Sequence, residues 1–168
     1  MYNSDTLVTS DTFNFKISKI EQRIKYLTFG KNYNQELNPG VLPVNLLELN
    51  FGKSFNKKIG SNVLPRSLIK LKFGDDYDQQ IEYGVLPDNL LELRFGNAFK
   101  QKIHSGILPI NLTLLKLGDE YNHIIDNYML PESITTLILS SKYNREQLDN
   151  NFLPKKIKNI LFGEENYS

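Results

Sequence analysis

The segment LPVNLLELNFGKSFNKKIGSNV, residues 42–63, is the unit from which most of this chain is built. Its leading Leu-Pro pair returns five more times, and the successive steps are 22, 22, 22, 22 and 23 residues. The six pairs are Leu42-Pro43, Leu64-Pro65, Leu86-Pro87, Leu108-Pro109, Leu130-Pro131 and Leu153-Pro154. A fixed period in the twenties is typical of solenoids, in which each short coil stacks on the next. The repeat therefore predicts a single elongated repeat domain.

Apolar residues hold the same three places in every repeat. They stand three, six and eight positions after the proline, as Leu46, Leu49 and Phe51 do in the quoted unit. The last two alternate with period two, which is typical of a short strand with one buried face. Strands at the same place in successive coils pair in parallel, and the rest of each coil supplies the return connection. The sequence thus predicts a β-rich solenoid with about 22-residue coils, a parallel strand ladder, short helical turns and little regular helix.

Three further columns indicate how each coil turns. A glycine follows the strand, as at Gly52, and predicts a tight bend or a close backbone approach, with positive φ. The pattern Pro-x-x-Leu predicts a single helical turn that begins at the proline. Asn or Asp recurs at one loop position, as at Asn34, Asn56 and Asp78. There the side chain is expected to bond turn backbone that stacking removes from water.

The strings FNKKI (55–59), YDQQI (77–81) and FKQKI (99–103), each followed by Leu-Pro, resemble the FNIP repeat. The resemblance covers about residues 20–163 and implies a short leucine-rich-repeat-like fold. Lys100 in the Asn column and Ser140 in the Gly column depart from the pattern. Similar family members are found chiefly in social amoebae and giant DNA viruses, often behind an F-box that delivers a bound protein to a ubiquitin ligase. Only 19 residues precede the first predicted coil, too few for an F-box, so we do not expect the ligase role to transfer.

The chain is predicted to contain a cap and a solenoid. Coils begin near residues 20, 42, 64, 86, 108, 130 and 153 and fill residues 20–168. Residues 1–19 are predicted to form an N-terminal β cap, because 12–17 alternates like a strand and is expected to pair with 7–9. One extra residue near Arg145 is expected to bulge outward. The last coil is truncated, so its edge is either defended by charge or covered by a second copy.

Composition excludes several classes of function. The 168 residues contain no cysteine, which removes disulfides, thiolate catalysis and Cys-based zinc sites. The 20 basic and 19 acidic residues give a net charge of +1, so no overall charge draws nucleic acid or anionic membrane. Apolar runs are too short for a transmembrane helix, and the first residues lack the features of a secretory signal. We therefore expect a cytoplasmic location, in the host cytoplasm if the source is a virus.

Residues with catalytic or metal-binding chemistry are few and scattered. His104 and His123 are the only histidines and occupy different columns, without metal-ligand spacing. Asp75, Asp76 and Asp78 gather three carboxylates, but other coils place Lys, Ser, Asn or Ala at the first two positions, which favours a solvated turn over a calcium site. The sequence contains no phosphate loop and no nucleophile elbow. We expect no catalytic residues, no cofactor and no metal.

The outward side chains of the predicted strand ladder are the candidate binding face. A basic group on this face lies beside an apolar group that contains Leu114, Ile138 and Leu161. One interpretation is a solvated face of mixed charge, and the sharper one is a partner site with an apolar anchor and a basic rim. The predicted partner-binding residues are Lys70, Lys72, Glu92, Arg94, Leu114, Lys116, Ile138 and Leu161.

The sequence therefore predicts a non-enzymatic scaffold that binds an unidentified protein through this face. The alternative is a structural or assembly protein that self-associates, for instance as a homodimer, through its coil ends or the apolar patch. Nucleic acid is a less favoured partner for the basic group, and no membrane association is expected.

Overall fold

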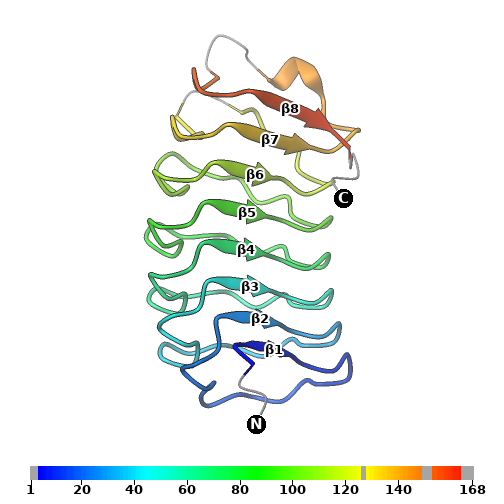
Figure 1. Ribbon diagram of the computed structural model, residues 1–168. Helices are drawn as coiled ribbons and strands as arrows, with labels where there is room; N and C mark the ends of the chain where they lie inside the picture. The colour runs from blue at the N-terminus through cyan, green and yellow to red at the C-terminus, as the bar shows by residue number, and fades with distance from the viewer. Residues whose placement is uncertain (1–3, 126–127, 149–152, 164–168) are drawn as a thin grey trace.

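The computed structural model describes residues 4–125, 128–148 and 153–163, and eight strands within them form one parallel sheet (Figure 1). Each strand pairs with the next in chain order. The only helix among the described residues is η1 (Arg145–Gln147), a single 3₁₀ turn. The predicted β-solenoid with a parallel strand ladder is confirmed. The strands are β1 (Thr6–Val8), β2 (Tyr26–Thr28), β3 (Glu48–Asn50), β4 (Lys70–Lys72), β5 (Glu92–Arg94), β6 (Leu114–Lys116), β7 (Thr136–Leu139) and β8 (Asn159–Phe162).

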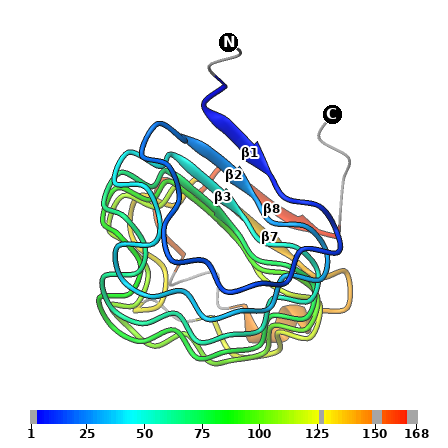
Figure 2. The same ribbon diagram turned by 90° about the horizontal axis from the view of Figure 1, so that it is seen from below.

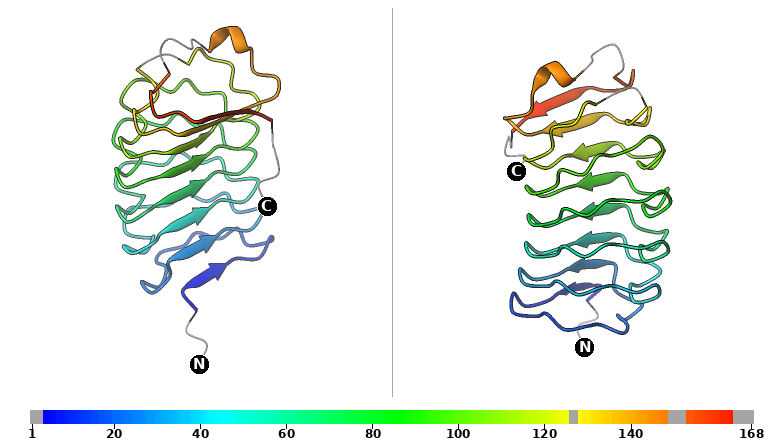
Figure 3. Two further views of the ribbon diagram at one scale, coloured as in Figure 1. Left: turned by 45° about the horizontal axis from the view of Figure 1, so that its top comes forward. Right: turned by 180° about the vertical axis from the view of Figure 1, so that it is seen from behind.

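The strands line one side of the solenoid, and irregular return segments close the other. Viewed along the stack, each coil is a loop of chain with its strand on one flank (Figure 2). Figure 3 shows the coils lying one above the next, in a tilted view and from behind. Because a strand occupies only three or four residues of each coil, most backbone groups must find partners in turns or in the neighbouring coil.

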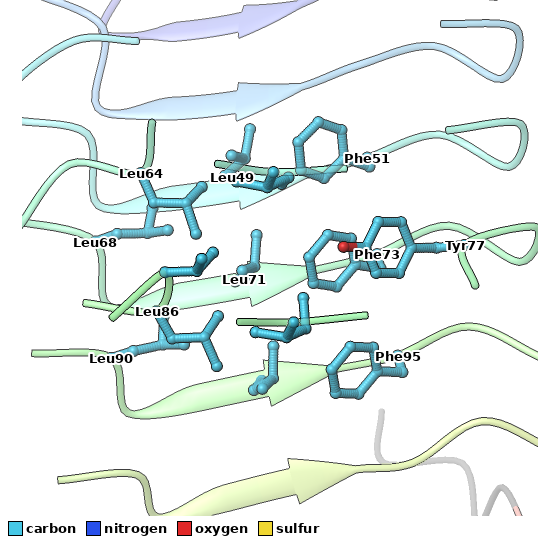
Figure 4. Close-up of a cluster of buried hydrophobic side chains, with 14 of the residues drawn as sticks. Leu49, Phe51, Leu64, Leu68, Leu71, Phe73, Tyr77, Leu86, Leu90 and Phe95 are labelled. Atoms are coloured by element: carbon cyan, nitrogen blue, oxygen red, sulfur yellow. The ribbon is translucent and has the colours of Figure 1, made fainter. Parts of the chain in front are cut away.

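The core is a set of side-chain columns that run along the stack. Leu49 pairs in register with Leu71, and both side chains are buried (Figure 4). Beside them, the rings of Phe51 and Phe55 stack within one coil at 3.8 Å between centroids. Phe55 continues to Tyr77 of the next coil at 6.0 Å. Each coil thus buries the same shapes against its neighbours, as a nearest-neighbour solenoid requires.

Close backbone contact explains the glycine after each strand. A methyl group on Gly52 would overlap the carbonyl oxygen of Gly30 and stand 2.9 Å from the Cα of Lys31. Adjacent coils therefore meet through backbone at this column, and any side chain would force them apart. The predicted positive φ at this column is wrong for the internal coils. Positive φ among the described glycines is confined to Gly40, Gly84, Gly106 and Gly163.

Two hydrogen-bonded turns flank each of the first four Leu-Pro pairs. After the pair, the amide of Leu46 donates to the carbonyl oxygen of Pro43 at 3.2 Å, which closes one short turn. Before the pair, the amide of Val41 donates to Asn38 at 3.3 Å, with Gly40 at φ 82°. This second turn is of type II, which requires positive φ at its third residue. Later coils place Asn62, Gly84 and Gly106 there, with φ of 63°, 75° and 78°.

A ladder of Asn and Asp side chains ties the return segments together. The Oδ1 of Asn34 accepts from the amide of Asn56 at 3.0 Å, and the Oδ1 of Asn56 accepts from the amide of Asp78 at 3.0 Å. Asp78 continues the series to the amide of Lys100 at 3.1 Å. The Lys100 side chain has no acceptor atom and cannot extend it. The expected role of this column in bonding turn backbone is therefore seen in these coils.

The N-terminal segment forms a further coil instead of a hairpin. β1 is parallel to β2, with Leu7 opposite Leu27, whereas residues 12–17 form no strand. Phe13 stacks on Tyr33 at 5.9 Å between centroids, in the aromatic column of the later coils. The predicted strand over 12–17 is therefore wrong, because its alternating residues belong to the return segment of this coil. The division into a cap and a solenoid domain stays a prediction.

The extra residue near the C-terminal end lies at η1, on the return side. The Oδ1 of Asn144 accepts from the amide of Glu146 at 3.1 Å and caps the turn. The guanidinium carbon of Arg145 lies 4.1 Å from the centroid of the Phe162 ring. β7 and β8 nevertheless stay in register, with Leu137 opposite Ile160. The insertion is thus absorbed outside the core columns.

Candidate interaction surface

The outer face of the sheet carries two continuous rows of side chains. Strand alternation turns Glu48 and Asn50 outward and Leu49 inward, and the same holds along the ladder. Because the strands pair in register, the outward residues of successive coils stand side by side. The first row is Tyr26, Glu48, Lys70, Glu92, Leu114, Thr136 and Asn159, and the second is Thr28, Asn50, Lys72, Arg94, Lys116, Ile138 and Leu161.

Ion pairs organise the charged middle of this face. The Nζ of Lys70 lies 3.0 Å from the Oε1 of Glu48, across the junction of β3 and β4. The hydrogen bond to Glu48 and its negative charge raise the pKa of Lys70. Within β5, Arg94 pairs with Glu92. Strands β3–β6 carry four basic and two acidic residues, so this part of the face has a formal charge of +2.

The apolar end of the face is less exposed than its pattern predicts. Leu114 and Leu161 are half-buried, whereas Ile138 is only 7% exposed. Ile138 lies outside the core cluster, between Lys116 and Leu161 in the second row. Neighbours in one row of a sheet cover each other's side chains, and the short side chain of Ile138 is covered most. The prediction of three exposed aliphatic residues is therefore wrong for Ile138.

Sequence reasoning missed a second surface, at the corner of the turns that precede the Leu-Pro pairs. A hollow of about 760 Å³ is lined there by turn residues of three successive coils, among them Asn62, Gly84 and Gly106. Tyr83 is 77% exposed and its ring lies against Gly106, while Ile110 is 72% exposed. The available signal was an apolar residue directly after Leu-Pro at Ile110, where the other coils, except for Val44, place a charged residue.

Of the histidines and carboxylates singled out in the sequence, His123 and Asp78 take part in the framework of the return side. A ring nitrogen of His123 lies 2.9 Å from the carbonyl oxygen of Lys100, at the place where Gln79 and Gln101 reach back to earlier coils. Asp78 belongs to the ladder of turn bonds. Over residues 4–125, 128–148 and 153–163, no group of three or more His, Asp or Glu is placed to hold a metal ion. No helix in those ranges has the length and apolar character to cross a membrane.

Comparison with known proteins identifies the family to which the chain belongs. The FNIP Repeat family profile matches four times, over residues 6–54, 55–98, 99–142 and 121–165. One similar solved structure is titled "The crystal structure of CroV588 a novel circular LRR protein structure". It is 38% identical with a TM-score of 0.88, and the match covers 94% of this chain but 23% of that one. No curated protein gives a significant match. The chain has a leucine-rich-repeat-like solenoid fold and belongs to the FNIP repeat family.

Proposed function

We propose that this chain is a non-enzymatic scaffold that binds a protein partner through the outer face of its strand ladder. The contrast between the two faces of the sheet carries this proposal. Inward columns keep Leu or Phe from coil to coil, whereas the outward rows change residue type at almost every strand. In a repeat fold, positions that do not pack against neighbouring coils are the ones that can be adapted to a partner. The solenoid fold of this family, which is typical of interaction scaffolds, supports the proposal.

The proposed contact is centred on Leu114 and the basic residues beside it. Leu114 is half-buried between Glu92 and Thr136, so a partner side chain can complete its burial. Lys72 is exposed in the adjacent row. The formal charge of +2 over β3–β6 favours a partner that presents acidic groups around an apolar residue. The proposed partner-binding residues are Lys70, Lys72, Glu92, Arg94, Leu114, Lys116 and Leu161; the buried Ile138 supports its neighbours.

A paired-variant capture experiment tests this proposal. The ladder variant carries Lys72→Glu with Leu114→Lys, and the control carries Lys102→Glu with Ile110→Lys on the exposed return side. Each variant replaces one lysine with glutamate and one aliphatic residue with lysine, so their net charges are equal. Partners captured by the tagged native chain and identified by mass spectrometry are expected to be lost from the ladder variant and kept by the control. Loss from the control alone, with both variants folded by circular dichroism, would assign binding to the return side instead.

A further inference from the structure

Within the described residues the sheet has two edge strands, β1 and β8, and no other strand pairs with the outward backbone groups of β1. At β1, the amide of Thr9 donates to Thr28 at 3.0 Å, and the carbonyl of Asp5 accepts from the amide of Tyr26 at 3.1 Å. Alternate residues of a parallel strand bond to opposite sides. The backbone groups of Thr6 and Val8 therefore point away from β2. Those of Thr6 are bonded to the Ser4 hydroxyl, which accepts from the Thr6 amide at 3.2 Å and lies 3.3 Å from the Thr6 carbonyl oxygen, so a pairing strand would replace these bonds.

The β8 edge presents backbone groups that match those of β1. The amide of Asn159 donates to Thr135 at 3.1 Å, and that of Gly163 donates to Leu139 at 2.8 Å. By the same alternation, the backbone groups of the residues between them, Ile160 and Phe162, point away from β7. A strand that continued the ladder past β8 would bond to these groups as β8 bonds to β7.

The side-chain columns of the sheet would also continue from one copy to the next. Carried one coil further, the register of the sheet would set Leu7 of a second copy opposite Ile160 and Val8 opposite Leu161. Leu7 and Ile160 are only partly buried, although the residues at this position in the coils between them are buried. Pairing of the two edge strands would increase the burial of both, because each would gain a neighbour at the side that β2 or β7 does not cover.

Neither edge strand carries the charges that protect exposed strands. The edge strands read Thr-Leu-Val in β1 and Asn-Ile-Leu-Phe in β8, with no charged residue and no proline. The central strands β4 and β5, which are paired on both sides, read Lys-Leu-Lys and Glu-Leu-Arg. Natural sheets usually place charge or proline at open edges to prevent pairing with another chain. In this sheet, charged residues lie in the central strands β4 and β5 and are absent from the edge strands β1 and β8.

From these observations we infer that copies of this chain associate head to tail, with β1 of one copy pairing in parallel with β8 of another. The contact is heterologous, because different surfaces of the two copies meet, so it builds open chains or closed rings in place of a limited dimer. An antiparallel pairing of two β8 edges would instead stop at a dimer. This inference does not depend on the partner-binding function proposed above.

Sedimentation velocity of the full chain and three variants tests the inference. The native chain is expected to exceed the monomer mass of 19.4 kDa increasingly over roughly a hundredfold rise in concentration. Val8→Pro removes an outward amide of β1 and Ile160→Pro removes one of β8, so each variant alone is expected to stay monomeric. An equimolar mixture of the two is expected to form dimers, because each supplies the end that the other lacks. Ile110→Pro is the control: Ile110 is 72% exposed, is the second residue of a turn, where proline is favoured, and lies away from both ends.

Two results would overturn the inference. A native chain that stays at 19.4 kDa at every concentration would show that the edges do not pair. Dimers of Val8→Pro alone would show that β8 pairs with itself and that the contact is not head to tail. Circular dichroism of each variant separates lost association from lost folding.

Discussion

Gly74 lies so close to Gly52 of the preceding coil that a methyl group on Gly74 would overlap the Gly52 carbonyl oxygen. The same methyl would stand 2.9 Å from the Cα of Lys53. Both obstacles are backbone atoms, which cannot rotate aside as a side chain can. The spacing of the coils, and with it the spacing of the strands, is therefore set at this column by direct backbone contact.

Gly74→Ala is expected to destabilise the fold by about 3 kcal/mol or more, because two coils must separate to admit the methyl group. Gly60→Ala is the matched control, since a methyl group at Gly60 meets nothing within 4 Å. It is expected to change the free energy of unfolding by less than about 1 kcal/mol. Urea denaturation followed by circular dichroism measures both. Equal effects of the two substitutions would contradict the role assigned to backbone contact.

Asn56→Ala is expected to cost about 1–2 kcal/mol, because the amide of Asp78 and the Nε2 of Gln79 both lose their acceptor. Asn56→Asp keeps an acceptor oxygen, as Asp78 does naturally in the next coil, and is expected to retain most of the stability. The exposed Asn45 supplies a neutral Asn→Ala control. Urea midpoints rank the three variants. An Asp variant as unstable as the Ala variant would count against the ladder.

Tyr77→Phe is expected to stabilise the protein by about 1 kcal/mol, because the buried hydroxyl of Tyr77 has no hydrogen-bond partner. Phe55 and Phe99 already fill the same column in the flanking coils. Tyr143→Phe is the contrasting variant, since its hydroxyl donates to the carbonyl oxygen of His123 at 2.8 Å, and it is expected to lose about 1 kcal/mol. Thermal unfolding distinguishes the two signs. A loss of stability in Tyr77→Phe would show that its hydroxyl finds a partner in solution.

Stability is expected to fall in alkaline solution above pH 10. Burial raises the pKa of Tyr33 to about 12 and also raises the pKa of Tyr77. An unfolded tyrosine ionises near pH 10, so above that pH deprotonation favours the unfolded chain. The contribution of Tyr33 is complete below pH 10 and is lost as the pH rises towards 12. Urea midpoints at pH 9 and 11 measure the fall, which is expected to be smaller in Tyr77→Phe. No change between these pH values would contradict the burial of both phenols.

The repeat columns made most of the fold predictable, and departures from the repeat explain what was missed. Leu49 and Phe51 recur at a fixed period, so strand, register and core follow from spacing alone. The N-terminal coil lacks Leu-Pro, and Phe13 precedes Tyr33 by 20 residues in place of 22, which hid its place in the series. The sequence predicted that the backbone at Gly52 requires glycine. Only the stacking of the coils shows that close backbone contact, and not positive φ, is the reason.

The candidate face was predictable only in outline. Strand alternation identifies which side chains point outward, since it depends on backbone geometry alone. The pairing of Lys70 with Glu48 and the burial of Ile138 depend on how neighbouring side chains pack across the rows. Those contacts involve residues about 22 positions apart that no local pattern links. The corner hollow beside Tyr83 is built from three coils and escaped prediction for the same reason.

Lysine reactivity in a complex with a captured partner tests the central claim most directly. Acetylation of the chain alone and of the complex is compared at each lysine by mass spectrometry. The account predicts that Lys72 and Lys116, on the ladder face, lose reactivity in the complex while Lys102, on the return side, keeps it. Protection of Lys102 with unchanged reactivity at Lys72 and Lys116 would contradict binding through the strand ladder.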